Sequence, residues 1–163
     1  MAFVRAHPDT RRQLLATFIS GIAAGLAATV AYDVAKALLS LFDATRWDPF
    51  EATHVFGLVL IGDAAPDPLV RAAGWMFHFS NGATFGMSFT FLFGTWARAN
   101  RLAAIALGAA WGVFLESFQL ALFPGWLSIK ALDEFRQVSF LAHVVFGVTL
   151  GFLVRRLERR ARP

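Results

Sequence analysis

Four long apolar stretches are the feature that most limits what this chain can fold into. A helix that crosses the ~30 Å hydrocarbon core of a bilayer needs about 20 mostly apolar residues. The sequence has four such windows, at about 13–42, 69–96, 102–124 and 137–154. A fifth apolar run, Val55–Ile61, is too short to span and suits an interfacial or re-entrant piece. We therefore expect an all-α, polytopic membrane protein in which residues 1–163 form one domain, an up-and-down bundle of four transmembrane helices.

The composition agrees with a chain that is embedded in a membrane. Of its 163 residues, 57% are hydrophobic and only 16% are charged, which is too apolar for an ordinary soluble domain. The chain contains no cysteine, which excludes disulfides, Fe–S clusters and cysteine-ligated zinc. Chemistry at a site therefore falls to His, Asp, Glu or Tyr. No nucleophile–base arrangement or phosphate-binding loop is recognisable.

The basic residues predict the orientation of the bundle, because loops rich in Lys and Arg face the cytoplasm. They cluster before the first helix, between the second and third, and after the fourth: Arg5, Arg11, Arg12, Arg98, Arg101, Arg155, Arg156, Arg159, Arg160 and Arg162. Both termini are therefore expected in the cytoplasm, with the loop 43–68 outside. The net charge of +4 suits the anionic headgroups of a lipid bilayer. We expect the bilayer as a partner, and no nucleic acid.

Each of the four helices carries a stripe of small residues at a spacing of four, together with one ionisable side chain. The stripes are Gly21, Gly25, Thr29 and Asp33; His78, Gly82 and Gly86; Gly108, Gly112 and Glu116; and His143, Gly147 and Gly151. Small residues at this spacing let transmembrane helices approach closely. The order acid, histidine, acid, histidine also suggests that a helical hairpin has been duplicated, with the two copies parallel.

The four ionisable side chains lie at a similar depth in the expected bundle. Asp33, His78, Glu116 and His143 each lie within nine residues of the outer end of their helix. At 1.5 Å per residue they fall roughly 9–14 Å below the outer boundary. Ionisable groups inside a membrane are costly and mark functional sites. We therefore expect one polar site in the outer half of the bundle, built from these four side chains, with a redox or sensing role.

Haem b is the first cofactor that such a site suits. His78 and His143 would supply both axial ligands from diagonal helices. Glycines one turn away would let the macrocycle lie close to the backbone, and arginines two turns outward would bind its propionates; these residues are Gly82, Gly147, Arg71 and Arg136. The layout resembles the haem-binding bundle of the cytochrome b family, in which histidines of the second and fourth helices ligate haem. That family has two histidines on each ligating helix, and this chain has one.

A single divalent transition metal is the second cofactor that the pattern suits. Two imidazoles and two carboxylates are ligands for Zn²⁺, Mn²⁺ or Fe²⁺, and here they would be Asp33, His78, Glu116 and His143. The Glu-x-x-His spacing of di-iron bundle proteins is absent. We therefore expect one metal ion in such a site and not two.

An interpretation without a cofactor stays open beside these two. Polar groups inside a membrane usually pair with each other, for example Asp33 with Lys36. Such a network would only hold the helices in register. The protein would then be a non-catalytic accessory or structural subunit of a larger membrane complex, with other membrane subunits as its partners. These patterns do not decide whether the chain is an enzyme.

The chain from the second helix onward resembles a known group of membrane proteins. A histidine helix is followed by a Gly-rich helix that ends in Phe123–Pro124–Gly125, and by a last helix with Ala142–His143, Gly147 and an Arg-rich tail. This order is similar to the YagU-like group of uncharacterised bacterial inner-membrane proteins, over a little more than half of the chain. The resemblance implies a multi-pass protein of the bacterial inner membrane without an assigned reaction.

Overall fold

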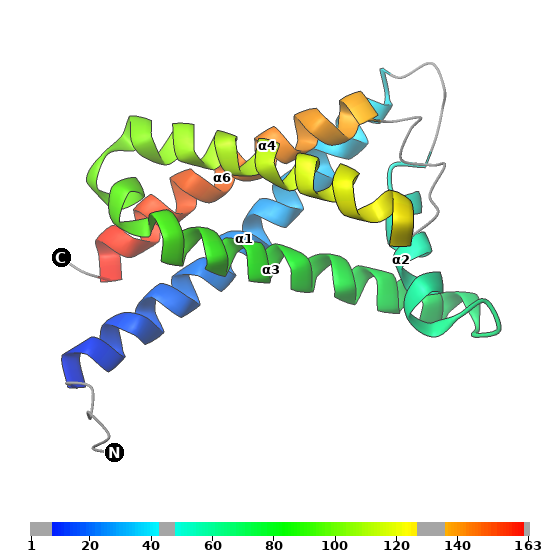
Figure 1. The fold of residues 1–163 in the computed structure, drawn as a ribbon, viewed down its shortest axis with the longest axis horizontal. Helices are drawn as coiled ribbons and strands as arrows, with labels where there is room; N and C mark the ends of the chain where they lie inside the picture. Colours follow the sequence, from blue (N-terminus) through cyan, green and yellow to red (C-terminus); the bar gives the residue numbers. More distant parts are fainter. Residues whose placement is uncertain (1–7, 43–47, 127–135, 162–163) are drawn as a thin grey trace.

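The computed structural model describes residues 8–42, 48–126 and 136–161. Within these ranges the chain forms five helices and no strand, and the all-α prediction is confirmed. The helices are α1 (Pro8–Ser40), α2 (Glu51–Ile61), α3 (Asp67–Ala99), α4 (Arg101–Trp126) and α6 (Arg136–Ala161). Figure 1 shows the four long helices running along the molecule, with the short α2 at one end. The expected loop 43–68 therefore contains a helix, which begins at Glu51 and takes in the short apolar run.

Three of the four long helices are long and apolar enough to cross a membrane: Thr10–Ser40, Arg101–Ala121 and Val138–Arg160. The fourth, α3, has 33 residues and a length of about 50 Å. Its sequence between His78 and Thr90 includes an amide, several hydroxyls and two glycines, which lower its hydropathy. Length and composition thus support three spans directly, and a fourth span by α3 depends on where its polar residues point.

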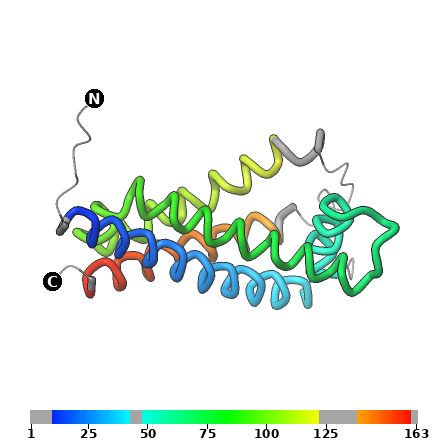
Figure 2. Tube along the Cα trace, turned by 90° about the horizontal axis from the view of Figure 1, so that it is seen from below, coloured from blue at the N-terminus to red at the C-terminus, as the bar shows by residue number. Residues whose placement is uncertain are grey.

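The long helices pack as a four-membered ring in chain order. α1 packs against α3 and α6, α4 packs against α3 and α6, and α3 and α6 also touch across the middle. The short α2 packs against α3. The start of α1 and the end of α6 lie at the same end of the molecule, and α2 lies at the opposite end (Figures 1 and 2). We call the latter the α2 end.

Glycines bring α1 against α3 and α4 against α6. A Cβ atom on Gly25 would overlap the backbone carbonyl of Gly82, and one on Gly108 would overlap the carbonyl of Gly147. Backbones can approach this closely only where side chains are missing. Both seams therefore have the same construction: an acid-bearing helix packs on the histidine-bearing helix of its own hairpin. The repeat seen in the sequence is a repeat of this contact.

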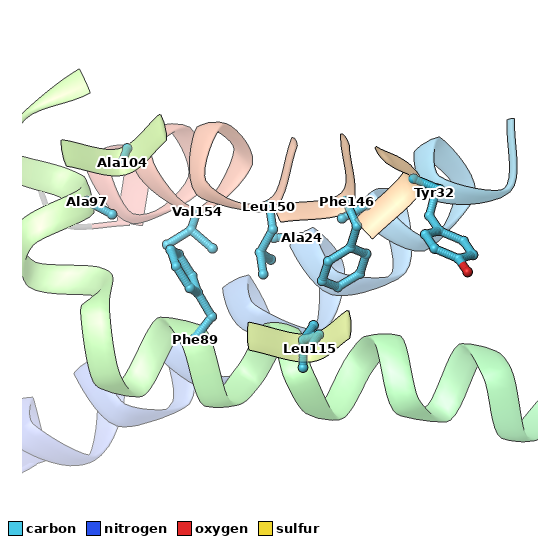
Figure 3. Packing of buried hydrophobic residues seen from close by; sticks show 11 residues of the cluster. Ala24, Tyr32, Phe89, Ala97, Ala104, Leu115, Phe146, Leu150 and Val154 are labelled. Atoms are coloured by element: carbon cyan, nitrogen blue, oxygen red, sulfur yellow. The ribbon is translucent and has the colours of Figure 1, made fainter. Parts of the chain in front are cut away.

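The apolar core runs along the axis of the ring, and the outer surface is apolar as well. Phe89, Leu150 and Val154 are completely buried near the middle of the row shown in Figure 3. Tyr32 stands at one end of this row, and its hydroxyl points away from the other labelled side chains. Large apolar side chains also face outward on all four long helices, among them Val30, Phe91, Phe114 and Phe152. A surface of this kind suits contact with lipid.

Candidate functional site

The first acid–histidine pair forms across the seam between α1 and α3. Asp33 Oδ1 lies 2.9 Å from His78 Nε2, and both side chains are mostly buried. The pair continues the line of the glycine contacts, one to two turns nearer the α2 end. Thr29 lies between Gly25 and Asp33 on the stripe, and its hydroxyl donates to Gly25 O of its own helix at 2.9 Å. On this stripe the small residues therefore make the close contact with α3, and Asp33 makes the polar contact with His78.

The second pair forms across the seam between α4 and α6 and is more deeply buried. Glu116 Oε2 lies 2.7 Å from His143 Nδ1, and the Glu116 side chain is 3% exposed. The Ser139 hydroxyl donates to the same carboxylate oxygen at 2.9 Å. The other oxygen, Glu116 Oε1, is buried and has no hydrogen-bond partner within the described residues. An unsatisfied buried acceptor is uncommon, because it loses water without gaining a partner.

Tyr32 joins the two pairs, although the sequence pattern indicates no role for it. Its ring centroid lies 5.8 Å from that of His78 and 4.8 Å from that of His143. Its hydroxyl is hydrogen-bonded to Ser139. Tyr32 therefore contacts both histidines and the serine that bonds to Glu116.

The position of Tyr32 follows from the order of the helices around the ring. Consecutive residues of a helix point about 100° apart. Asp33 faces α3, so Tyr32 faces the other neighbour of α1, which is α6. A single tyrosine beside the acid was a signal in the sequence, but its meaning depends on which helix lies on each side.

A cavity of about 220 Å³ touches both pairs. Its polar wall contains both histidines and Asp33, and also the one-turn neighbours of the four expected site residues: Lys36, Asn81, Gln119 and Ser139. Lys36 is 4% exposed, and its Nζ lies 5.7 Å from the centre of the Tyr32 ring. A buried cation one turn from Asp33 offsets part of the charge of this acid. The rest of the wall is largely phenylalanine, contributed by Phe50, Phe56, Phe77, Phe85, Phe118 and Phe146.

Arg71 does not lie at this cavity. It is exposed near the start of α3, where its Nε donates to Asp67 Oδ2 at 2.8 Å. Asp67 also lies 3.0 Å from His54 Nε2, an ion-pair contact that ties α2 to α3. The arginine holds the pKa of the Asp67 carboxyl below its usual value. The expected role of Arg71 in binding propionates is therefore not supported by its position, and the side chain of Arg136 lies outside the described part of the chain.

The four expected metal ligands form two pairs and not one cluster. In residues 8–42, 48–126 and 136–161, no group of three or more His, Asp or Glu side chains is arranged to hold a metal ion. Tyr32 and both histidines line one cavity of about 220 Å³, which is small for a macrocycle. Of the two glycines expected beside haem, Gly82 lines the cavity, whereas Gly147 packs against Gly108. Haem and metal binding stay predictions, and this geometry favours a smaller ligand.

Comparison with known proteins places the chain in a family. A family model described as a family of unknown function, DUF6789, matches residues 15–163. Since the match covers most of the sequence, the chain belongs to this family. The comparisons with curated proteins and with solved structures return no match. The resemblance to the YagU-like group is tested by none of these comparisons and stays a prediction.

Proposed function

We propose that this member of the DUF6789 family is a multi-pass protein of the bacterial inner membrane, with four transmembrane helices and both termini in the cytoplasm. The three apolar spans and the apolar outer surface support insertion into a membrane. α3 qualifies as a fourth span because His78 and Asn81 line the internal cavity, so their polar atoms avoid lipid. The proposed orientation rests on arginines at the end opposite α2, such as Arg101 and Arg159.

The site of this protein binds a small amphipathic ligand or cofactor in a redox or sensing role. The observation that carries this proposal is the cavity of about 220 Å³, whose wall combines Asp33, His78 and His143 with phenylalanine rings. Protein interiors are close-packed, and voids larger than a water molecule are few. A network that served only for packing has no need of such a space, whereas a binding site requires it.

Each pair has the arrangement of a fixed proton acceptor or donor. A carboxylate accepts a hydrogen bond from one ring nitrogen and thereby holds the imidazole in one orientation and tautomer. The opposite ring nitrogen then serves a ligand as an acceptor when the ring is neutral and as a donor when it is protonated. His78 is held by Asp33 in this way, and His143 is held by Glu116.

The alternative function is that of an accessory or structural subunit of a larger membrane complex. The observation that favours it is that the four ionisable groups pair with each other along the two glycine seams. Paired groups at these positions would fix the register of the helices without binding a ligand. The exposed phenylalanines of α3 and α4 would then contact other subunits instead of lipid.

Analysis of the components bound to the purified protein separates the two functions. Native mass spectrometry and solvent extraction detect an organic ligand, and absorption spectra with elemental analysis detect haem or metal. The binding function predicts a bound component in the wild type that is lost in Asp33→Asn and Glu116→Gln. The control Val34→Ala changes an exposed neighbour of Asp33 and should keep it. A wild type without a bound component, with the two site variants only less stable, would support the structural subunit.

A further inference from the structure

Two equivalent groups reach the cavity from the two hairpins. His78 on α3 and His143 on α6 both line it. Each is held by an acid from the helix that packs along its own seam. The Tyr32 ring touches both imidazoles, so they belong to one site and not to two separate ones. A ligand that uses both histidines therefore needs two polar atoms on opposite sides.

The free edges of these imidazoles suit an oxygen atom that changes its protonation state. Among the described residues, His143 makes its polar contacts through Nδ1, and His78 makes its contact through Nε2. The remaining nitrogen of each ring can accept a hydrogen bond from a hydroxyl or, when the ring is protonated, donate one to a carbonyl. Few other side chains can bind both the hydroxyl form and the carbonyl form of one ligand.

The walls of the cavity are largely aromatic and leave little space. Phe77, Phe85, Phe118 and Phe146 line it, and the Tyr32 ring lies against both imidazoles. Aromatic rings pack favourably on other flat rings in stacked or edge-to-face contact. A volume of about 220 Å³ is below the roughly 300–1,000 Å³ of pockets for drug-sized ligands. The space suits one substituted six-membered ring better than a macrocycle.

The cavity also reaches the apolar outer surface, between α3 and α4. Phe118 lines it and is 40% exposed, and its ring centroid lies 6.3 Å from that of Phe85 across this seam. The close glycine contacts of the described helices hold α1 to α3, α2 to α3 and α4 to α6, and none of them joins α3 to α4. A ligand with a hydrocarbon tail can keep its ring inside while the tail remains in lipid.

We propose that the cavity binds the headgroup of a membrane quinone and of its quinol. One ring oxygen lies at His78 and the other at His143, and the tail leaves between Phe85 and Phe118. This assignment rests on the ligand-binding function proposed above and names the class of ligand. It concerns binding of the two forms, whose carbonyl and hydroxyl oxygens match the two hydrogen-bonding states of the imidazoles.

Titration of the full-length protein in nanodiscs with a decyl-substituted benzoquinone and its quinol tests the proposal. The Trp75 ring centroid lies 5.7 Å from that of His78, so quenching of its fluorescence reports occupancy, with equilibrium dialysis as an independent measurement. We expect saturable binding at one site. His78→Ala and His143→Ala should each weaken it about tenfold, the effect of one lost hydrogen bond. Val145→Ala, an exposed position two residues from His143, should leave it unchanged.

A variant outside the acid–histidine pairs shows whether weaker binding can occur without loss of folding. Phe118→Trp enlarges a side chain at the proposed opening and should weaken binding of the decyl quinone while the helical circular dichroism is unchanged. Decanol is the control for simple partition of the tail. Binding of decanol equal to that of the quinone, or unchanged binding in both histidine variants, would overturn the quinone proposal.

The two proposals fail in different ways. If the wild type carries another bound component that the acid variants lose, but does not bind the decyl quinone, the ligand class is wrong and the binding function stands. If the wild type carries no component and binds no quinone, both proposals fail together.

Discussion

Tyr32 and Asp33 are neighbours in the chain, yet they contact different hairpins. Asp33 pairs with His78 of α3 at 2.9 Å, whereas the Tyr32 ring lies 4.8 Å from that of His143 on α6. The turn of about 100° between consecutive residues corresponds to the angle between the two neighbours of α1 in a four-membered ring. One turn of α1 therefore contacts both acid–histidine pairs, which lie in different hairpins. Within the packing of α1 against α6, the Tyr32 side chain is the contact that links the two acid–histidine pairs.

Tyr32→Phe tests that link. The change removes the hydroxyl that bonds to Ser139 and keeps the ring contacts. We expect the free energy of unfolding to fall by about 1 kcal/mol, the value of one buried hydrogen bond. Ser88→Ala is the control, because the exposed Ser88 hydroxyl donates to Thr84 O of its own helix at 2.9 Å. In a double-mutant cycle with Ser139→Ala, strictly additive effects would show that the two hydroxyls do not interact.

Gly108→Ala tests whether close approach of the backbones brings the second pair together. A Cβ there would overlap the carbonyl of Gly147, so α4 and α6 must separate. We expect a loss of about 1–3 kcal/mol, typical of overpacking, together with weakened contact between Glu116 and His143. The control is Gly94→Ala, since a Cβ at Gly94 meets only the Thr90 methyl, at 3.4 Å. Thermal unfolding should show a lower Tm for the first variant and no decrease for the second.

The two seams could be predicted from the sequence because each stripe is a property of one helix. Spacing alone places Gly25 and Asp33, or Gly108 and Glu116, on a common face and at a common depth. The partner of each face is the next long helix along the chain, which the repeated order of acid and histidine indicates. The close contacts and the two ion pairs therefore lie on the faces that the pattern indicates.

Convergence of all four ionisable groups could not be judged in the same way. Helix axes pack about 8–10 Å apart, and the diagonal of a ring is longer. A short side chain such as that of Asp33 can contact the neighbouring helix α3 but not the helix across the diagonal. Whether Tyr32 fills the centre depends on the order of the helices around the ring, which spacing does not contain. The extension of the last helix from the expected residue 154 to Ala161 likewise depends on charged side chains, which apolar windows leave out.

The contacts of Asp67 with Arg71 and His54 predict how low pH affects the stability of the α2 end. Arg71 and, to a lesser degree, His54 lower the pKa of Asp67 from its ordinary value of 3.8. A depressed pKa in the folded state means that this carboxylate contributes stability above its unfolded pKa and loses it as the pH falls through the folded value. Because Asp67 is fully exposed, solvent screening keeps the effect small.

Arg71→Gln should therefore raise the pKa of Asp67 toward 3.8. Carboxyl carbon shifts in an NMR titration measure the pKa directly, with Asp63 on the preceding turn as an internal reference. A pKa of Asp67 that does not change in the variant would contradict the assigned contact.

Cysteine labelling tests the four-span topology and its orientation. The chain has no cysteine, so single-cysteine variants need no background removal. Asp63→Cys lies between α2 and α3, and Ala99→Cys lies at the other end of α3; both positions are exposed.

In intact bacterial cells, a maleimide that enters the periplasm but does not cross the inner membrane should label the Asp63→Cys variant and leave the Ala99→Cys variant unlabelled. After disruption of the inner membrane, the maleimide reaches both sides and both variants should react. If α3 did not span the membrane, the two positions would share one side and react alike in intact cells. Labelling of Ala99→Cys alone would keep the four spans and invert the orientation.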